Sequence, residues 1–388
     1  MSRQSYAGVA VAVPITVPYQ RYSTQGAHWF VGQALQALIQ ASGVAKDDID
    51  GLCLSSFSLS PDTAVGLTQH LGLSPRWLDH IPTGGASGVM ALRRAARAVQ
   101  AGDADVVACI GADTNHVDSF RQTLGSFSHF ARDASYPYGS GGPNSVFAFI
   151  TANYMRTYGA QREDFGRIAV DQRSNALKNP NALFKKPLSL EEYMAGRPIS
   201  DPIHLFDCVM PCAGADAFLV MSEKRAQDLG LPHAIIRGAI ERHNAFASDP
   251  IMVQGGWRRD LADLYAQADA APAQVDFVQT YDDYPVIVMM QFEDLGFCAK
   301  GEGPQFVRDH RMTHDGSFPN NTSGGQLSVG QAGAAGGFIG MVEALRQLCD
   351  LAGERTVPGA QLGLVSGFGM VTYDRCLCTG AVLLGRSA

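Results

Sequence analysis

Two glycine-rich turns, one in each half of the chain, each lead directly into an amphipathic helical pattern. Residues 84–88 precede a pattern over residues 89–100, in which three arginines lie opposite an apolar stripe. Residues 330–340 lead in the same way into a second pattern over residues 338–350. A turn and helix that recur once in each half indicate a duplicated α/β unit.

Short apolar runs alternate with the helical patterns and are typical of buried strands. The alternation predicts a layered α/β fold in two halves, residues 1–228 and 229–388. A chain of 388 residues is long enough to form two hydrophobic cores. The runs lie at residues 51–56, 105–111, 234–239, 275–280, 362–366 and 377–384, with a further helical pattern at residues 29–41.

The regular alternation breaks between about residues 113 and 202. This stretch is rich in Asn, Ser and Arg and contains the sequence Tyr-Pro-Tyr-Gly-Ser-Gly-Gly-Pro at residues 136–143. Long insertions in compact α/β enzymes commonly cover an active site. We therefore expect an inserted loop domain at the site.

Composition limits the classes of partner. The net charge is -7 and no long basic run occurs, so neither nucleic acid nor an anionic membrane is an expected partner. No apolar stretch reaches the roughly 18 residues that span a bilayer. Pro14 and Pro18 interrupt the apolar start, which we expect to form a first strand and not a secretory signal. The cytoplasm is the expected location.

The eight cysteines fit reduced thiols better than a disulfide framework. Cys208 and Cys212 are spaced closely enough to be considered as metal ligands, as are Cys376 and Cys378. Both pairs lie in apolar segments without the histidine spacing of a zinc site, so we expect buried core residues and no metal.

Small-residue motifs follow one another along nearly the whole chain. They are Gly-Ala-Ser-Gly at residues 85–88, Ala-Gly-Asp-Ala-Asp-Val-Val at 101–107, Pro-Ile-x-x-x-Asp-Cys at 202–208, Ala-Gly-Ala-Asp-Ala-Phe at 213–218, Glu-Asp-Leu-Gly-Phe-Cys at 293–298 and Asn-x-Ser-Gly-Gly at 321–325. In this order they resemble the thiolase superfamily, especially its sterol-carrier-protein-type branch. The resemblance implies the thiolase fold, with two duplicated layered αβαβα halves and an inserted loop domain. It also implies an acyl-CoA thioester as substrate and no separate cofactor.

The four positions at which a thiolase carries its catalytic side chains all differ in this chain. The nucleophilic Cys of the family falls on Gly85, which has no side chain and cannot form an acyl-enzyme. The family's Gly-His-Pro histidine falls on Gln331, whose amide cannot shuttle a proton near neutral pH. The C-terminal Cys falls on Ser366, and the usual Asn or His of the remaining motif falls on Tyr281.

Thiolase-like retro-aldolases of steroid side-chain degradation are similar at Tyr281 and also lack the nucleophilic Cys. They carry a second tyrosine where this chain has Gln331. The resemblance therefore implies aldol-type cleavage of a 3-hydroxyacyl-CoA, with Tyr281 as acid or base. We expect Asp282, Asp283 or His80 to tune Tyr281, and we include Gln331 and Ser366 in the site. Backbone amides would supply an oxyanion hole, from Gly85, Ala86, Gly367 and Gly369.

Two other functions stay open. The chain could be a thiolase or acetyl-CoA acyltransferase whose nucleophile has moved to Cys208 or Cys212, although burial is the simpler interpretation of both. It could also be a non-catalytic subunit of a heteromeric thiolase-like complex. Tyr281 would then be a core tyrosine at a strand end, and His80 an ordinary loop residue.

The resemblance also implies partners. Thiolases pack their sheets across a two-fold axis, so we expect a homodimer. Retro-aldolases of this kind often need a small partner with an oligonucleotide-binding-type fold and a zinc ribbon, which delivers the CoA ester.

Overall fold

A single large sheet runs through the molecule. The computed structural model describes residues 5–115, 136–140 and 142–387. Within these residues the sheet has nine strands in the order β3-β2-β4-β7-β1-β8-β11-β10-β9. The strands are β1 Val9–Gln20, β2 Gly51–Ser55, β3 Trp77–His80, β4 Val106–Asp113, β7 Ala213–Ser222, β8 His233–His243, β9 Phe277–Gln279, β10 Leu362–Thr372 and β11 Arg375–Arg386, and a separate pair is β5 Pro198–Ser200 and β6 Ile203–His204.

The sequence halves separate within the sheet. The first five strands in the spatial order come from the first half of the chain, and the last four come from the second. The antiparallel pairing of β1 with β8 joins the two halves. The predicted boundary at residue 228 falls between α9 and β8. The helices are α1 Ala27–Ser42, α2 Ala64–Leu71, α3 Ser87–Ala101, α6 Pro143–Tyr158, α7 Arg162–Ala176, α8 Leu190–Met194, α9 Glu223–Asp228, α10 Trp257–Ala268, α11 Pro285–Asp294, α12 Gly303–Asp309, α13 Gly325–Val329 and α14 Ile339–Leu348.

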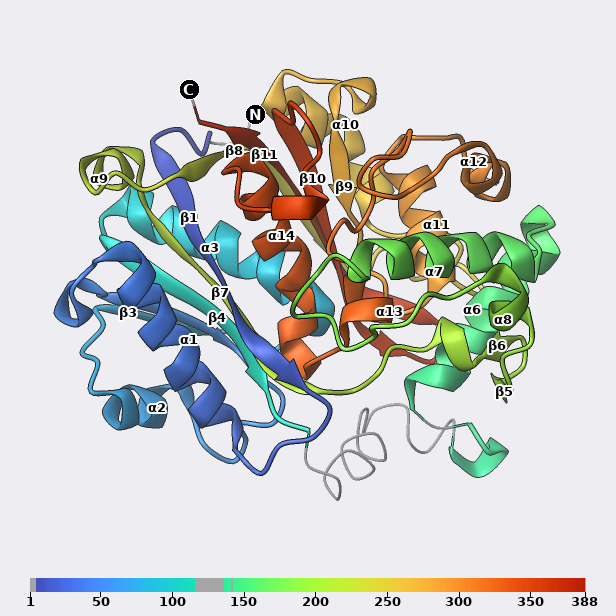
Figure 1. Cartoon of the computed structure of the whole chain (residues 1–388), viewed down its shortest axis with the longest axis horizontal. Helices are drawn as coiled ribbons and strands as arrows, with labels where there is room; N and C mark the ends of the chain where they lie inside the picture. Colours follow the sequence, from blue (N-terminus) through green and yellow to red (C-terminus); the bar gives the residue numbers. More distant parts are fainter. Residues whose placement is uncertain (1–4, 116–135, 141, 388) are drawn as a thin grey trace.

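Helices α3 and α14 form the middle layer (Figure 1). Each contacts strands of both halves: α3 packs on β4 and β10, and α14 packs on β1 and β10. Helix α1 covers the outer face of the first half, and α10 covers β8 and β11 of the second. The predicted layered α/β fold with duplicated halves is confirmed.

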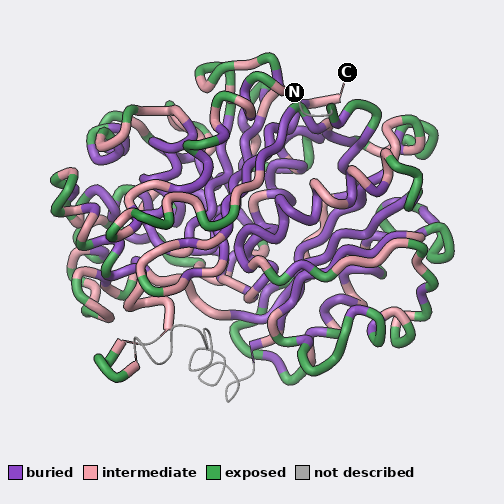
Figure 2. The backbone as a smooth tube through the Cα atoms, turned by 180° about the vertical axis from the view of Figure 1, so that it is seen from behind, coloured by how far each residue is buried: buried purple, intermediate pink, exposed green. Residues whose placement is uncertain are grey.

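Strand β1 contributes side chains to two hydrophobic cores, one on each face of the sheet. Val9 and Val11 face the middle layer, whereas Ala10 and Ala12 face α1, because successive side chains of a strand point to opposite faces. All four side chains are buried. A strand covered on both faces reads as a continuous apolar run, and Figure 2 shows such buried strands crossing the centre of the molecule.

The two glycine-rich turns lie against each other, as the 3-10 turns Gly84–Ala86 and Gly333–Gly337. A Cβ atom on Gly88 would stand 2.1 Å from the carbonyl oxygen of Gly337. One on Gly337 would stand 2.9 Å from the carbonyl oxygen of Gly84. Glycine is needed because the two backbones meet directly and leave no room for side chains.

The insertion begins outside the described residues and then forms helices. Residues 116–135 and 141, part of the predicted loop domain, lie outside the described ranges. Helix α6 packs on β10 and α11, and α7 packs on α11, α12 and α13. The insertion is therefore attached to the second half of the molecule, beside the cavity described below.

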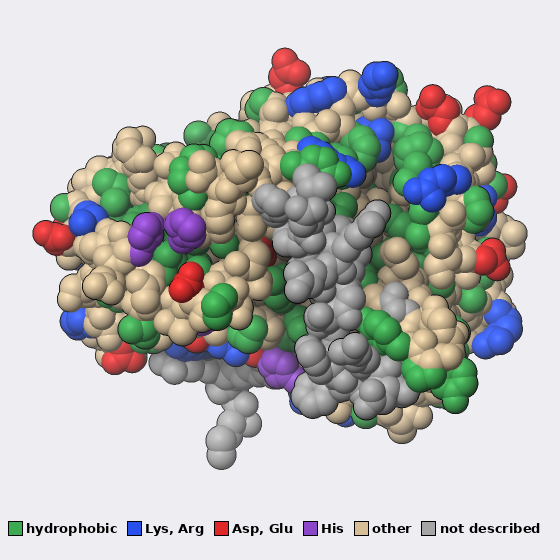
Figure 3. Space-filling view, turned by 90° about the horizontal axis from the view of Figure 1, so that it is seen from below, with side chains coloured by type: hydrophobic (Ala, Val, Ile, Leu, Met, Phe, Trp, Pro, Cys, Tyr) green, Lys and Arg blue, Asp and Glu red, His purple; other side chains and the backbone are tan. Residues whose placement is uncertain are grey.

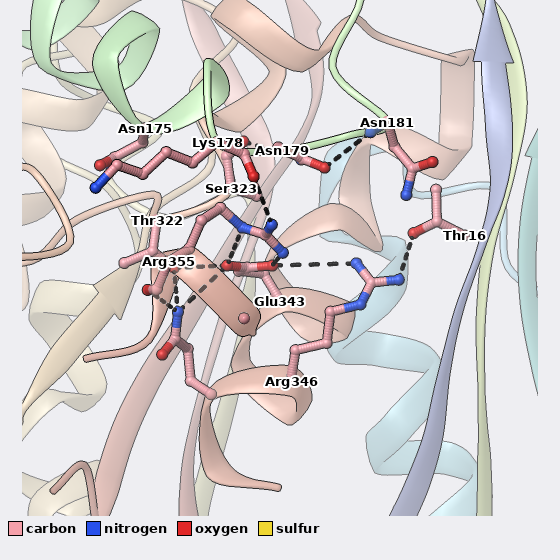
Figure 4. A network of polar contacts seen from close by, with 12 residues as sticks. Thr16, Asn175, Lys178, Asn179, Asn181, Thr322, Ser323, Glu343, Arg346 and Arg355 are labelled. Atoms are coloured by element: carbon pink, nitrogen blue, oxygen red, sulfur yellow. Dashed lines mark hydrogen bonds and ion pairs between the residues drawn. The ribbon is translucent and has the colours of Figure 1, made fainter. Parts of the chain in front are cut away.

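A buried polar network holds α14 in place (Figure 4). Glu343 has no exposed side-chain surface and accepts hydrogen bonds from both Nε and an Nη of Arg355, each at 3.1 Å. Its carboxylate also accepts from Thr322, at 2.9 Å. One turn along the helix, Arg346 donates to Thr16 of β1, at 2.9 Å. These contacts tie α14 to strand β1 and to the segments that carry Thr322 and Arg355.

The surface carries mixed charge. On the face shown in Figure 3, Lys and Arg side chains lie scattered among acidic and apolar ones. Within the described ranges, none of the helices combines the length and apolar character needed to cross a membrane.

Candidate active site

A cavity of about 510 Å³ opens between the two glycine-rich turns, the start of α6 and the end of β10. Its walls come from segments far apart in sequence, which the fold brings together at the ends of the central strands. Most of its lining is apolar, with a few polar side chains, as in many small-molecule sites. The lining residues are Phe57, Ser58, Ser60, Gly84, Gly85, Asp113, Thr114, Asn115, Pro143, Asn144, Cys208, Val209, Pro211, Cys212, Tyr281, Asp283, Tyr284, Gln331, Gly333, Phe368, Gly369, Met370 and Val371.

Tyr281 lies directly on Gly85. A Cβ atom on Gly85 would stand 1.9 Å from Cε2 and 2.0 Å from Cζ of the Tyr281 ring. The same ring stacks on Phe368, with centroids 6.1 Å apart and an interplanar angle of 12°. The phenol therefore fills the space that a side chain at position 85 would need.

The backbone of Tyr281 is held by a buried glutamine of α11. Gln291 accepts a hydrogen bond from the Tyr281 N–H at 3.1 Å and donates to the Tyr281 carbonyl at 2.7 Å. The Ser366 hydroxyl also donates to Gln291, at 2.6 Å. Ser366 is buried and does not line the large cavity, so its contact with the site passes through Gln291.

The Tyr281 hydroxyl meets two of the predicted site residues. Its oxygen lies 3.4 Å from Nε2 of Gln331, and the charge of the neighbouring Asp283 carboxylate acts on it. Gln331 also donates a short hydrogen bond to Asp283. The backbone of Gln331 is fixed by Met210 and Cys212, through bonds of 2.9 Å each. The structure thus brings Tyr281, Asp283 and Gln331 together in the cavity wall.

The pKa values of Tyr281 and Asp283 are both raised. Burial, followed by the charge of Asp283, raises the pKa of Tyr281 well above its usual value. Burial and the charge of Asp282 raise the pKa of Asp283 to about 7, although hydrogen bonds from Tyr281 and Gln331 oppose the rise. A phenol with a raised pKa is a proton donor at neutral pH, whereas Asp283 titrates near neutrality and suits a base.

Asp282 faces away from the cavity. Its carboxylate accepts from the backbone N–H groups of Gln326 at 2.9 Å and Leu327 at 3.2 Å, at the start of α13. Burial raises the pKa of Asp282 to about 6. Asp282 holds α13 against the Tyr281 segment and does not line the cavity.

Of the remaining predicted site residues, some line the cavity and others do not. His80 is exposed at the end of β3 and does not line the cavity. Gly85 and Gly369 line it, but Ala86 and Gly367 do not. The Ala86 N–H already donates to the Thr83 carbonyl at 3.2 Å, and a Cβ on Gly367 would stand 2.8 Å from Cα of Ala86.

Family models match most of the chain. The N-terminal thiolase domain matches residues 10–193, and the thiolase C-terminal domain-like family matches residues 238–379. The chain belongs to the thiolase superfamily. The thiolase fold implied by the sequence motifs is confirmed.

Individual relatives of this thiolase-like chain include lyases. A steroid side-chain-cleaving aldolase of Thermomonospora curvata is 33% identical over 334 residues, which cover 81% of this chain and 83% of the relative. A 17-hydroxy-3-oxo-4-pregnene-20-carboxyl-CoA lyase of Mycobacterium tuberculosis is 32% identical and covers 81% and 84%. The solved structure of the Ltp2-ChsH2(DUF35) aldolase matches with a TM-score of 0.84 and 29% identity, over 98% of each chain.

Two cysteines of this thiolase-like cavity are candidates for a displaced nucleophile. Cys208 and Cys212 both line the cavity. Burial raises the pKa of the Cys208 thiol to about 12, and burial raises that of Cys212 as well. Since the thiolate is the nucleophile, two thiols that stay protonated at neutral pH are poorly suited to attack a thioester.

Among the cavity residues that were not predicted from the sequence are three polar ones that hydrogen bonds hold within the site. Asn144 and Tyr284 form a hydrogen-bonded pair, with the Tyr284 hydroxyl 2.5 Å from Oδ1 of Asn144. The Asp113 carboxylate accepts from Ser58 N at 2.7 Å and Ala334 N at 2.6 Å, so it joins the segment after β2 to the second glycine-rich turn. Asp113 ends the sequence Gly-Ala-Asp at residues 111–113, and Tyr284 ends the sequence Tyr-Asp-Asp-Tyr at residues 281–284. Asn144 carried no signal in the sequence.

Proposed function

We propose that the chain is an acyl-CoA carbon–carbon lyase that cleaves a 3-hydroxyacyl-CoA by a retro-aldol reaction. One observation carries the proposal: the Tyr281 phenol, which shares the Gln331 amide with Asp283, occupies the space from which a nucleophile at position 85 would act. The site thus has an acid–base pair and no thiol there. Retro-aldol cleavage needs a base and an enolate site, but no covalent intermediate.

The reaction begins with a proton relay. The Tyr281 oxygen takes the proton of the substrate's β-hydroxyl while the Tyr281 proton passes to the Asp283 carboxylate. The β-carbon oxygen then forms a carbonyl, and the bond between the α- and β-carbons breaks. Its electron pair enters the thioester as an enolate. Asp283 and Tyr281 then return the proton to the α-carbon. The products are an aldehyde or ketone and a shorter acyl-CoA.

The raised pKa of Tyr281 is consistent with this relay. A free phenolate would be scarce at neutral pH, so Tyr281 acts by passing a proton on to Asp283. Gln331 holds both groups and cannot itself titrate. The activities for which the two lyase relatives are named support the same class of reaction.

The wider assembly is also part of the proposal. The name of the Ltp2-ChsH2(DUF35) aldolase joins two components, which supports a partner for this chain. We assign that partner an oligonucleotide-binding-type fold with a zinc ribbon, and the chain itself a homodimer in the cytoplasm. Co-purification of the tagged chain with the product of a neighbouring reading frame tests the partner.

Turnover by the purified complex tests the reaction. A branched 3-hydroxyacyl-CoA is incubated with the enzyme, and the carbonyl product and shorter acyl-CoA are measured together. Tyr281→Phe should lower turnover by about 10²- to 10⁴-fold, the usual contribution of a general acid–base group. Tyr265→Phe is the matched control, because Tyr265 is also buried but donates to Leu295 outside the cavity. Equal turnover by wild type and Tyr281→Phe would instead support a non-catalytic subunit.

A further inference from the structure

The cavity offers few free donors for the enolate. A thioester enolate carries negative charge on its oxygen and needs hydrogen-bond donors already in position. Among the described residues that line the cavity, three side chains carry an N–H group: Asn115, Asn144 and Gln331. Asn115 donates to the carbonyls of Arg21 and Pro211, at 2.9 and 3.1 Å. Gln331 donates to Asp283 and Tyr281.

Asn144 is different because its amide nitrogen has no partner within the described part of the chain. Its oxygen, Oδ1, accepts from the Tyr284 hydroxyl at 2.5 Å and lies 3.8 Å from the Cys208 thiol. Both neighbours donate to this oxygen, so the amide is assigned with Oδ1 on their side. The NH₂ group is therefore directed away from Tyr284 and Cys208 and is left for a ligand.

The amide is held rigidly. Tyr284 is 4% exposed, and its ring stacks on Phe147 with centroids 4.0 Å apart. Burial raises the pKa of Tyr284 well above its usual value, so its hydroxyl keeps its proton and continues to donate. Two other side-chain donors of the described lining are the hydroxyl of Ser60, which is exposed, and the thiol of Cys212, which is a weak donor. Only Asn144 is both free and oriented.

The position of Asn144 also favours an anion. It is the second residue of α6, a helix of 16 residues whose N-terminus carries the positive end of the helix dipole. Asp283, the group that takes up the proton in the proposed reaction, lines the same cavity and is close enough to raise the pKa values of Cys208 and Tyr284. The donor and the base therefore serve one substrate.

We propose that the side-chain N–H of Asn144 donates to the thioester oxygen of the bound acyl-CoA and holds the enolate formed when the carbon–carbon bond breaks. This inference rests on the proposed retro-aldol function. It replaces the Ala86 amide, which is already bonded to Thr83, as an expected oxyanion donor.

Exchange at the α-carbon separates this role from binding of the other product. The shorter acyl-CoA, with acetyl-CoA and propionyl-CoA as probes, is incubated with the enzyme complex in D₂O. Deuterium enters the α-carbon only through the enolate, and no aldehyde or ketone takes part. Cleavage of the 3-hydroxyacyl-CoA is measured beside it for each variant.

Asn144→Ala should lower both exchange and cleavage by about 10²- to 10³-fold, the usual effect of removing one oxyanion donor. Asn144→Asp should lose at least as much, because a carboxylate oxygen would face the enolate oxygen. Tyr284→Phe keeps the donor but releases its orientation, so a smaller loss in both rates is expected. Asn153→Ala, on the same helix, is the control, because Asn153 accepts from Arg156 away from the cavity.

Each outcome decides the matter. Parallel loss of exchange and cleavage in Asn144→Ala, at an unchanged melting temperature, supports the inference. Loss of cleavage with normal exchange places the amide on the leaving carbonyl group and overturns it, as does no change in either rate. If the wild-type complex exchanges but does not cleave, the enolate site stands and the proposed function fails. If the wild type does neither, both fall.

Discussion

The ring of Tyr281 occupies the space in which a side chain on Gly85 would begin. A Cβ atom there would stand 1.9 Å from the ring and 2.4 Å from the carbonyl oxygen of Phe368. A side chain at position 85 and the Tyr281 ring therefore exclude each other, because neither leaves room for the other.

Gly85→Ala should destabilise the protein and stop cleavage. The new methyl group displaces the Tyr281 ring, and overpacking of this kind costs about 1–3 kcal/mol. Denaturant unfolding measures the change, and product release measures activity. In a Tyr281→Ala background the same substitution should cost less, since only the Phe368 contact remains. Equal costs in both backgrounds would contradict the coupling.

The rate of cleavage should rise with pH through about 7. Asp283 accepts the proton only when ionised, and its pKa is raised to about 7 by burial and by the charge of Asp282. A profile of kcat/KM between pH 5 and 9 measures the midpoint. Asp283→Asn should remove most of the activity and the inflection with it. A wild-type rate that stays constant from pH 5 to 7 would rule out Asp283 as the base.

The stability of the protein should change with pH in the opposite direction to the rate. The contribution of Asp283 to stability should fall as the pH rises. The folded state raises the pKa of Asp283 above its unfolded value of about 4, so it favours the protonated form. The contribution of this carboxyl to stability is therefore present below about pH 4 and is lost as the pH rises through 7. Asp283→Asn should melt higher than wild type at pH 8, with the gap closing toward pH 4. Parallel melting curves at all pH values would contradict this sign.

Arg355→Met should be among the more destabilising single changes outside the cavity. It leaves the fully buried carboxylate of Glu343 without its main partner, and breaking a buried ion pair costs about 3–5 kcal/mol. Arg386→Met is the control, because its partner Asp350 is largely exposed and such pairs contribute at most about 1 kcal/mol. Similar losses in the two variants would show that the network in Figure 4 does not stabilise α14.

Much of the fold could be predicted from the sequence because its signals are local. The apolar runs at residues 51–56 and 105–111 became β2 and β4, and the pattern at residues 338–350 contains α14. The periodicity of a strand or helix is visible within a few residues, so these elements can be predicted without the tertiary structure.

Less of the site could be predicted from the sequence, because its residues come from segments that are distant in the chain. Tyr281 and Gln331 were found through motifs, but the direction of the Tyr281 pKa depends on burial and on Asp283, which only the fold sets. Asp282 and Asp283 are adjacent in sequence, yet one faces α13 and the other the cavity. Asn144 acquires its orientation from Tyr284, 140 residues away in sequence, and no local pattern records such a pair.

Mass measurement of the intact protein during turnover tests the central claim most directly. The enzyme is quenched in acid while it cleaves a 3-hydroxyacyl-CoA, and the protein and both products are measured. The account predicts unmodified protein, with carbonyl product and shorter acyl-CoA released in equal amounts. An acyl adduct that forms and decays at the rate of turnover, mapped to Cys208 or Cys212, would contradict it.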